Sequence, residues 1–218
     1  MRIPEEDQIE KLLTSIVFLA ESMERDRISP EELSSVLHLR SPLSLGQIPD
    51  GRLFIAIPRE QIELFIGRDR IDIRDLSGNK PGRKPTAKIA IELLDWLKAK
   101  WRAVGFNYEL IFSVPSGEKA GEFIVKNFLL SLEHLKDKIP ISGAGIRLFY
   151  RKEHKKYTLV IEPRRREETA EGIYINVNIH RDKSELNNKE VERLSTVSSL
   201  QEDFVKEYEG ILDVLKML

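Results

Sequence analysis

The residues best suited to chemistry lie on one strand-like stretch near residue 175. From Ile173 to Arg181, apolar and polar side chains alternate, and this alternation places the two sets on opposite faces of a β-strand. The polar set consists of Tyr174, Asn176, Asn178 and His180. Asparagine is depleted in strands, so a row of phenol, amide and imidazole groups indicates a face that can hold a ligand.

A general acid–base pair can be named on this face. If the neighbouring stretch 157–162 pairs alongside, Glu162 can share the face with His180. A carboxylate and an imidazole within hydrogen-bond reach can transfer protons to and from a substrate. The more common explanation of a polar strand face is the solvated side of an antiparallel sheet. Both interpretations stay open at this level.

The remaining residues do not form a metal or hydrolase motif. The other histidines are far apart and lack metal-ligand spacing; they are His38, His134 and His154. No Gly-x-Ser-x-Gly elbow occurs. The chain has no cysteine, which excludes disulfides, thiolate zinc sites and iron–sulfur clusters. We therefore predict no metal and no cofactor.

Two basic loops suggest a different class of partner. Residues 81–85 read Pro-Gly-Arg-Lys-Pro, which resembles a loose version of the AT-hook that lies in the minor groove of DNA. The loop also precedes a predicted helix, but its glycine spacing does not match a phosphate-binding loop. A second basic run follows strand 157–162. The candidate nucleic-acid contacts, in loops 80–84 and 164–166, are Arg83, Lys84, Arg164, Arg165 and Arg166. Solvated connectors are the simpler explanation of both.

The charge composition limits what can attract the protein to a partner. Among 218 residues, 35 are Lys or Arg and 36 are Asp or Glu, so the net charge is −1. Such a chain has no overall field for polyanions. A charged fraction of 33% without cysteine is typical of thermophile proteins. The apolar window 12–20 is too short to span a bilayer, so we expect a soluble cytoplasmic protein with no membrane contact.

The spacing of apolar residues predicts the elements in the first half. Residues 9–23 show helical spacing and are predicted to form a helix, although the β-branched run Ile16–Val17 is also compatible with a strand. Ser29, Pro30 and Glu32 form a capping signal for a second, short helix, and a loop follows. Strands are predicted at 52–57, 62–66 and 71–74. Thr86 is the expected N-cap of a long helix, which carries Leu97, Trp101 and Val104 on its apolar stripe and ends at Gly105.

The second half alternates strands and helices. We predict a strand at 106–114, a helix to about residue 138, strands at 146–151, 157–162 and 173–181, and a helix from 188 to the end, with a break at 195–199. The order α-α-β-β-β-α-β-α-β-β-β-α indicates an α+β fold with a mixed or mostly antiparallel sheet of about seven strands covered by helices. The expected division is a helical segment 1–50 and an α+β domain 51–218; one continuous domain 1–218 is the alternative.

No motif at diagnostic spacing specifies a reaction, so whether the chain is an enzyme stays open. We expect a non-catalytic binding or regulatory module. One alternative is an enzyme or small-molecule receptor that uses the polar face of strand 173–181, and another is a nucleic-acid-associated protein that uses the two basic loops. Trp96 lies off its helix's apolar stripe, and the last helix ends in apolar residues. Either can mark an interface, including one between two copies of the chain.

Overall fold

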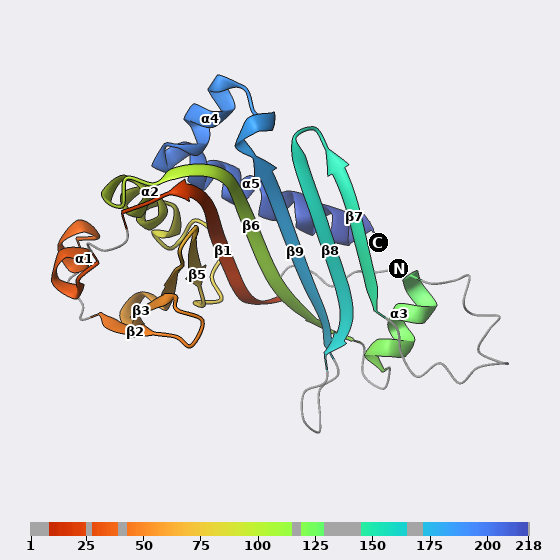
Figure 1. Cartoon of the computed structure of the whole chain (residues 1–218). Helices are drawn as coiled ribbons and strands as arrows, with labels where there is room; N and C mark the ends of the chain where they lie inside the picture. Colours follow the sequence, from red (N-terminus) through yellow and green to blue (C-terminus); the bar gives the residue numbers. More distant parts are fainter. Residues whose placement is uncertain are drawn as a thin grey trace.

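The computed structural model describes residues 9–24, 28–38, 43–114, 119–128, 145–164 and 172–217. These residues form an antiparallel sheet with the strand order β2-β3-β4-β5-β1-β6-β9-β8-β7 (Figure 1). The strands are β1 (Ile9–Ser22), β2 (Ser44–Gln47), β3 (Leu53–Ile57), β4 (Ile62–Ile66), β5 (Arg70–Asp75), β6 (Lys100–Ser113), β7 (Ile146–Lys152), β8 (Lys155–Arg164) and β9 (Gly172–Asp182).

The helices are α1 (Pro30–Val36), α2 (Thr86–Trp96), α3 (Ala120–Phe128), α4 (Asn188–Leu194) and α5 (Val197–Met217). Helix α5 runs behind the strands (Figure 1). It packs on β6, where the Phe204 ring lies 5.3 Å from the Phe106 ring and 5.2 Å from the Tyr108 ring. The buried side chains of α2 and α5 join one apolar cluster with the sheet. We call the face of the sheet that carries this cluster the inner face, and the opposite one the outer face.

The helix predicted over residues 9–23 is wrong, because this segment is the central strand β1. It pairs with β5 on one side and with β6 on the other. Ile16 and Phe18 face inward and are fully buried, while Val17 faces outward and is 6% exposed. A strand buried on both faces reads as a continuous apolar run, and the apolar periodicity imitates a helix over this length. The segment forms a strand because its backbone pairs with β5 and with β6.

The sheet has nine strands in the described residues, rather than about seven. Besides β1, the additional strand is β2, at residues predicted to be a loop. The domain division at residue 50 stays a prediction. Since β1 lies between two strands from beyond residue 50, the pairing favours the alternative of one continuous domain.

The predicted helix up to Gly105 is too long, and its N-cap residue is Pro85 and not Thr86, which is already helical. Helix α2 ends at Trp96, Lys98 adopts a positive φ of 47°, and β6 begins at Lys100. Trp101 therefore lies on a strand. Gly105 lies inside that strand, where an added Cβ would come within 3.4 Å of the Ile179 carbonyl oxygen.

Other local predictions are confirmed. Ser29 caps α1 by accepting a hydrogen bond from the Glu32 amide at 3.2 Å. The final helical stretch is interrupted at Ser195, which separates α4 from α5. The predicted continuation of α3 to residue 138 lies outside the described residues. No helix in the described ranges combines the length and the apolar character needed to cross a bilayer.

Candidate functional site

The predicted polar face lies on the outer face of β9, which is paired between β6 and β8. Its side chains are half-buried; they belong to Tyr174, Asn176, Asn178 and His180. On one side, β6 places Asn107 opposite Asn178. On the other side, β8 places Thr158 opposite the same residue. The polar row therefore continues across three strands.

Side-chain hydrogen bonds between neighbouring strands already occupy several polar groups of this row. Asn178 Nδ2 donates to Asn107 Oδ1, and Asn107 Nδ2 donates to Ser15 Oγ of β1 at 2.9 Å. Burial, the charge of Glu109 and a hydrogen bond to Glu109 raise the pKa of Tyr174 to about 12, so this phenol is neutral at neutral pH. These contacts tie β1, β6 and β9 together.

The structure does not bring His180 and Glu162 together. His180 lies opposite Lys156, and Glu162 lies opposite Tyr174, six residues away along β9. At about 3.3 Å per residue the separation is about 20 Å. The acidic partner of His180 is Asp182, whose Oδ1 lies 2.9 Å from Nε2. Asp182 also accepts a hydrogen bond from Lys156, so His180 shares its acidic partner with a lysine.

The first basic loop is anchored to the fold. Lys84 pairs with Glu60 at 3.3 Å, and Arg83 is exposed. The Gly82 carbonyl accepts a hydrogen bond from Gln201 of α5 at 2.8 Å, and Gly82 has a φ of 88°. The backbone therefore turns at Gly82, whereas an AT-hook lies extended in the groove.

The second basic loop begins where β8 ends. Arg164 is half-buried at that end, and Arg165 and Arg166 lie outside the described residues. A continuous basic surface across the two loops stays a prediction.

The most exposed apolar side chains gather around β7, which forms one edge of the sheet among the described residues. Six large hydrophobic side chains in those residues are exposed, and four of them lie on β7 or at the end of α5: Leu148 (46%), Phe149 (72%), Tyr150 (41%) and Val214 (38%). We call these four residues the β7 surface. Leu148 and Tyr150 lie on one face of the strand and Phe149 on the other, and large apolar side chains exposed in this way on an edge strand are typical of an interaction site.

A cavity of about 340 Å³ lies beside the β7 surface, between the β7–β8 hairpin and α5. The Tyr150 and Tyr157 rings stack in its wall, with centroids 4.5 Å apart and an interplanar angle of 4°. Helix α5 contributes Ile211 and Val214. Three lysines and two glutamates also line the cavity; they are Lys152, Lys155, Lys206, Glu153 and Glu207. The cavity thus offers aromatic and apolar walls beside charged groups that have a small positive excess.

An ionic network holds the inner wall of this cavity. Glu207 of α5 accepts hydrogen bonds from Arg181 at 2.8 Å and from the Tyr157 hydroxyl at 3.1 Å, and it pairs with Lys155. Burial and the Glu207 charge raise the pKa of Tyr157 far above its ordinary value. The phenol therefore stays protonated and Glu207 is fully engaged. This arrangement fixes α5 on the sheet and suits binding better than proton transfer.

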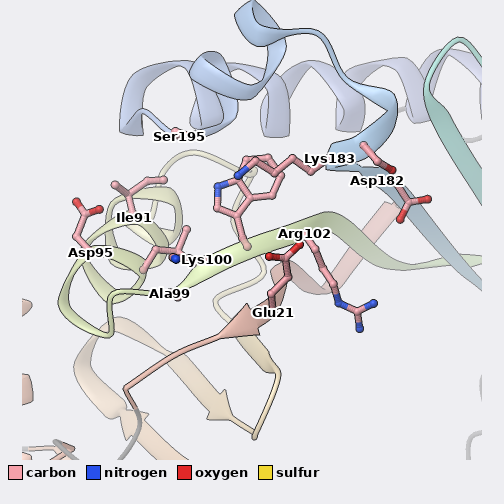
Figure 2. Close-up of a pocket in the computed structure, with 12 residues that line it drawn as sticks. Glu21, Ile91, Asp95, Ala99, Lys100, Arg102, Asp182, Lys183 and Ser195 are labelled. Atoms are coloured by element: carbon pink, nitrogen blue, oxygen red, sulfur yellow. The ribbon is translucent and has the colours of Figure 1, made fainter.

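A second cavity, of about 710 Å³, lies where β1 and α2 end, β6 begins and β9 ends (Figure 2). Trp101 lines it, with Lys183 over its ring. This cavity shares no lining residue with the first one.

No protein-family model matches the chain, and no curated protein matches it in sequence. The functional argument therefore rests on the geometry of these surfaces. Sequence reasoning missed the β7 surface, although one signal was present. Residues 148–150 read Leu-Phe-Tyr between two arginines, and three consecutive apolar residues place apolar groups on both faces of a strand.

Proposed function

We propose that the chain is a non-catalytic protein-interaction module that binds an extended, acidic segment of another protein along the edge of β7. The observation that carries this proposal is the gathering of exposed apolar side chains on an edge strand, beside a cavity.

The backbone of β7 supplies the first part of the binding energy. β7 pairs with β8 over its full length of seven residues, Ile146–Lys152. Its other side has no partner strand in the part of the chain that the structure describes. An exposed edge presents unpaired N–H and C=O groups to which an extended peptide can add as a further strand.

The apolar side chains supply the second part. Leu148 and Tyr150 lie opposite Leu159 and Tyr157 on the inner face, while Phe149 lies opposite Thr158 on the outer face. An added strand would place alternate side chains on the same two faces. One set would contact Tyr150 and the cavity, and the other set would contact Phe149.

The charges around β7 determine the chemistry of the partner. Arg147, Lys152 and Lys206 have no acidic partner among the described residues, whereas Arg151 pairs with Glu185 at 2.6 Å. An incoming segment with Asp or Glu would neutralise the three unpaired cations. A second copy of the chain fits less well, because antiparallel pairing centred on Phe149 would set Arg147 against Arg151. Like charges directly opposite destabilise a strand pair.

The test selects binders from a displayed library of random peptides, with the full chain as bait. We expect enriched peptides that alternate apolar residues with Asp or Glu. The double variant Arg147→Glu with Lys152→Glu should weaken their binding by roughly tenfold, since each exposed charge pair contributes up to about 1 kcal/mol. The matched control, Arg83→Glu with Lys189→Glu, reverses two exposed charges elsewhere and should leave the affinity unchanged.

Three outcomes contradict the proposal. One is no enrichment of acidic peptides. Another is slow hydrogen exchange along both sides of β7 in the free protein, which would show that residues 129–144 or another part of the chain already cover the edge. The third is a dimer in light scattering that becomes a monomer on Phe149→Glu, which would make the occupant a second copy.

The other two functions have less support. For an enzyme or receptor on β9, the His180 imidazole and the Asn178 amide are already bonded to Asp182 and Asn107. For a nucleic-acid contact, Lys84 is already paired with Glu60.

A further inference from the structure

The cavity lined by Trp101 has an aromatic wall that already binds a cation. Trp101 is 6% exposed, and its ring forms a T-shaped pair with the Phe18 ring, with centroids 5.8 Å apart and an interplanar angle of 71°. Lys183 Nζ lies 4.7 Å from the centroid of the Trp101 ring. Indole is the side chain that binds cations best through its face.

The position of Trp101 follows from the pairing of β1 with β6. The register of this pair shifts on either side of Ala20, which lies opposite Trp101. Such an irregularity redirects side chains near the end of a strand. On the neighbouring strand, the chain leaves β9 at Asp182 and enters a short 3-10 turn at Lys183. The lysine is therefore held by a turn and not by the sheet.

The charges that line the cavity favour keeping one positive charge at the position of Lys183 Nζ. Asp182 is occupied by His180 and Lys156, and Arg102 pairs with Asp69 at 3.7 Å. Lining residues with no charged partner among the described residues are Glu21, Asp95 and Lys100, together with Lys183 over the indole. If Lys183 moved away into solvent, two carboxylates would face one lysine.

Helix α2 strengthens this preference. Asp95 lies in its last turn, which contains no basic residue. The C-terminal end of a helix carries partial negative charge and stabilises cations, so a carboxylate there adds to an already negative wall. A cation in the cavity would offset both contributions.

We infer that this cavity binds a small organic monocation, an amine or quaternary ammonium compound, whose charged group takes the place of Lys183 on the Trp101 face. The volume of about 710 Å³ lies within the range of small-molecule sites. Lys183 acts as an internal substitute ligand that protects the indole while the site is empty. The ligand and Lys183 compete, so the lysine lowers the apparent affinity.

The experiment uses choline as the probe and its uncharged isostere, 3,3-dimethylbutan-1-ol, as the control. The variant Trp96→Phe leaves Trp101 as the single tryptophan, so its fluorescence reports the site. We expect a saturable change with choline and none with the alcohol. Lys183→Met keeps the length of the side chain but removes the competing charge, and it should tighten choline binding roughly threefold to tenfold.

The exposed carboxylates give a second test that does not disturb the core. Glu21→Gln with Asp95→Asn should weaken choline binding about threefold or more, whereas the matched pair Glu202→Gln with Glu209→Gln, on α5, should have no effect. The inference is overturned if choline gives no saturable change, or if the alcohol gives the same change. It is also overturned if Lys183→Met leaves the choline affinity unaltered.

Discussion

Asp182 shows how single charged residues are stabilised on the outer face. Its carboxylate accepts hydrogen bonds from Lys156 and from the His180 ring, and these two contacts lower its pKa. A carboxyl group whose pKa is lower in the folded state stabilises the fold above the unfolded-state pKa. This contribution is lost as the pH falls through the folded-state pKa.

Asp182→Asn should therefore reduce the free energy of unfolding at pH 7, by less than about 1 kcal/mol because the group is partly exposed. The difference from the parent chain should shrink as the pH falls below 3.8, the ordinary pKa of an aspartate. Urea unfolding at several pH values measures it. Asp95→Asn, at an exposed carboxylate, is the matched control. A difference of equal size at all pH values would show that the ion pair is not its cause.

Glu207 is a second carboxylate held by ion pairs, and its removal should cost more than that of Asp182 because it is more deeply buried. Its side chain is 11% exposed and that of Arg181 is 7% exposed. Glu207→Gln keeps a hydrogen-bond acceptor for Tyr157 but leaves Arg181 with Asp203 as its single acidic partner. We expect a loss of about 2–3 kcal/mol in guanidinium-induced unfolding, because hydrogen bonds to charged groups are the stronger ones. Glu209→Gln, exposed on the same helix, should cost little. An equal loss for both variants would contradict this account.

At the scale of elements, packing decides which segments become strands and how the connections run. β1 is a strand because partners on both sides satisfy its backbone, and its apolar residues face both the inner and the outer side. The loop before α2 is positioned by α5, since Gln201 donates to the Gly82 carbonyl. An added Cβ at Gly82 would come within 2.7 Å of Val205 Cγ2.

Gly82→Ala should destabilise the protein by about 1–2 kcal/mol, because a φ of 88° is unfavourable for residues with a Cβ; the close approach to Val205 adds to this. Thermal or urea unfolding measures the effect. Val205→Ala in the same chain should recover the steric part and leave the backbone part. Gly46→Ala is the control, since nothing lies within 4 Å of its added Cβ. Complete recovery by Val205→Ala would show that backbone strain contributes nothing.

At the scale of the whole molecule, ion pairs are linked into networks. Arg193 contacts Asp203 at 2.8 Å, and Asp203 contacts Arg181 at 3.0 Å. Lys156 joins Asp182 to Glu185. Networks of this kind gain importance at high temperature, because the cost of removing charges from water falls as the temperature rises.

We therefore expect a melting temperature above about 65 °C, beyond the usual mesophile range. Scanning calorimetry at low and high salt measures it. Salt should lower the melting temperature if exposed members of the networks contribute. A melting temperature of about 45–65 °C would contradict the thermophile interpretation of the composition.

The sequence alone determined the α+β class and most of the elements from Leu53 onward. Turn residues and side-chain period are local signals, and they located the hairpin of β4 and β5 and the strand β9 without reference to partners. The capping signal at Ser29 and the break at Ser195 were equally local.

The tertiary structure decided the rest. An apolar run such as 16–20 is compatible with a buried helix and with a buried strand. Its conformation therefore depends on the segments with which it packs and pairs. The alternation on β9 predicted a polar face correctly, but strand register placed Asp182, and not Glu162, beside His180. The β7 surface depends on which strand lies at the sheet's edge, and the Trp101 cavity depends on four chain segments meeting. The spacing of residues in the sequence predicts neither the edge position of β7 nor the Trp101 cavity, because both arise from contacts between residues far apart in the chain.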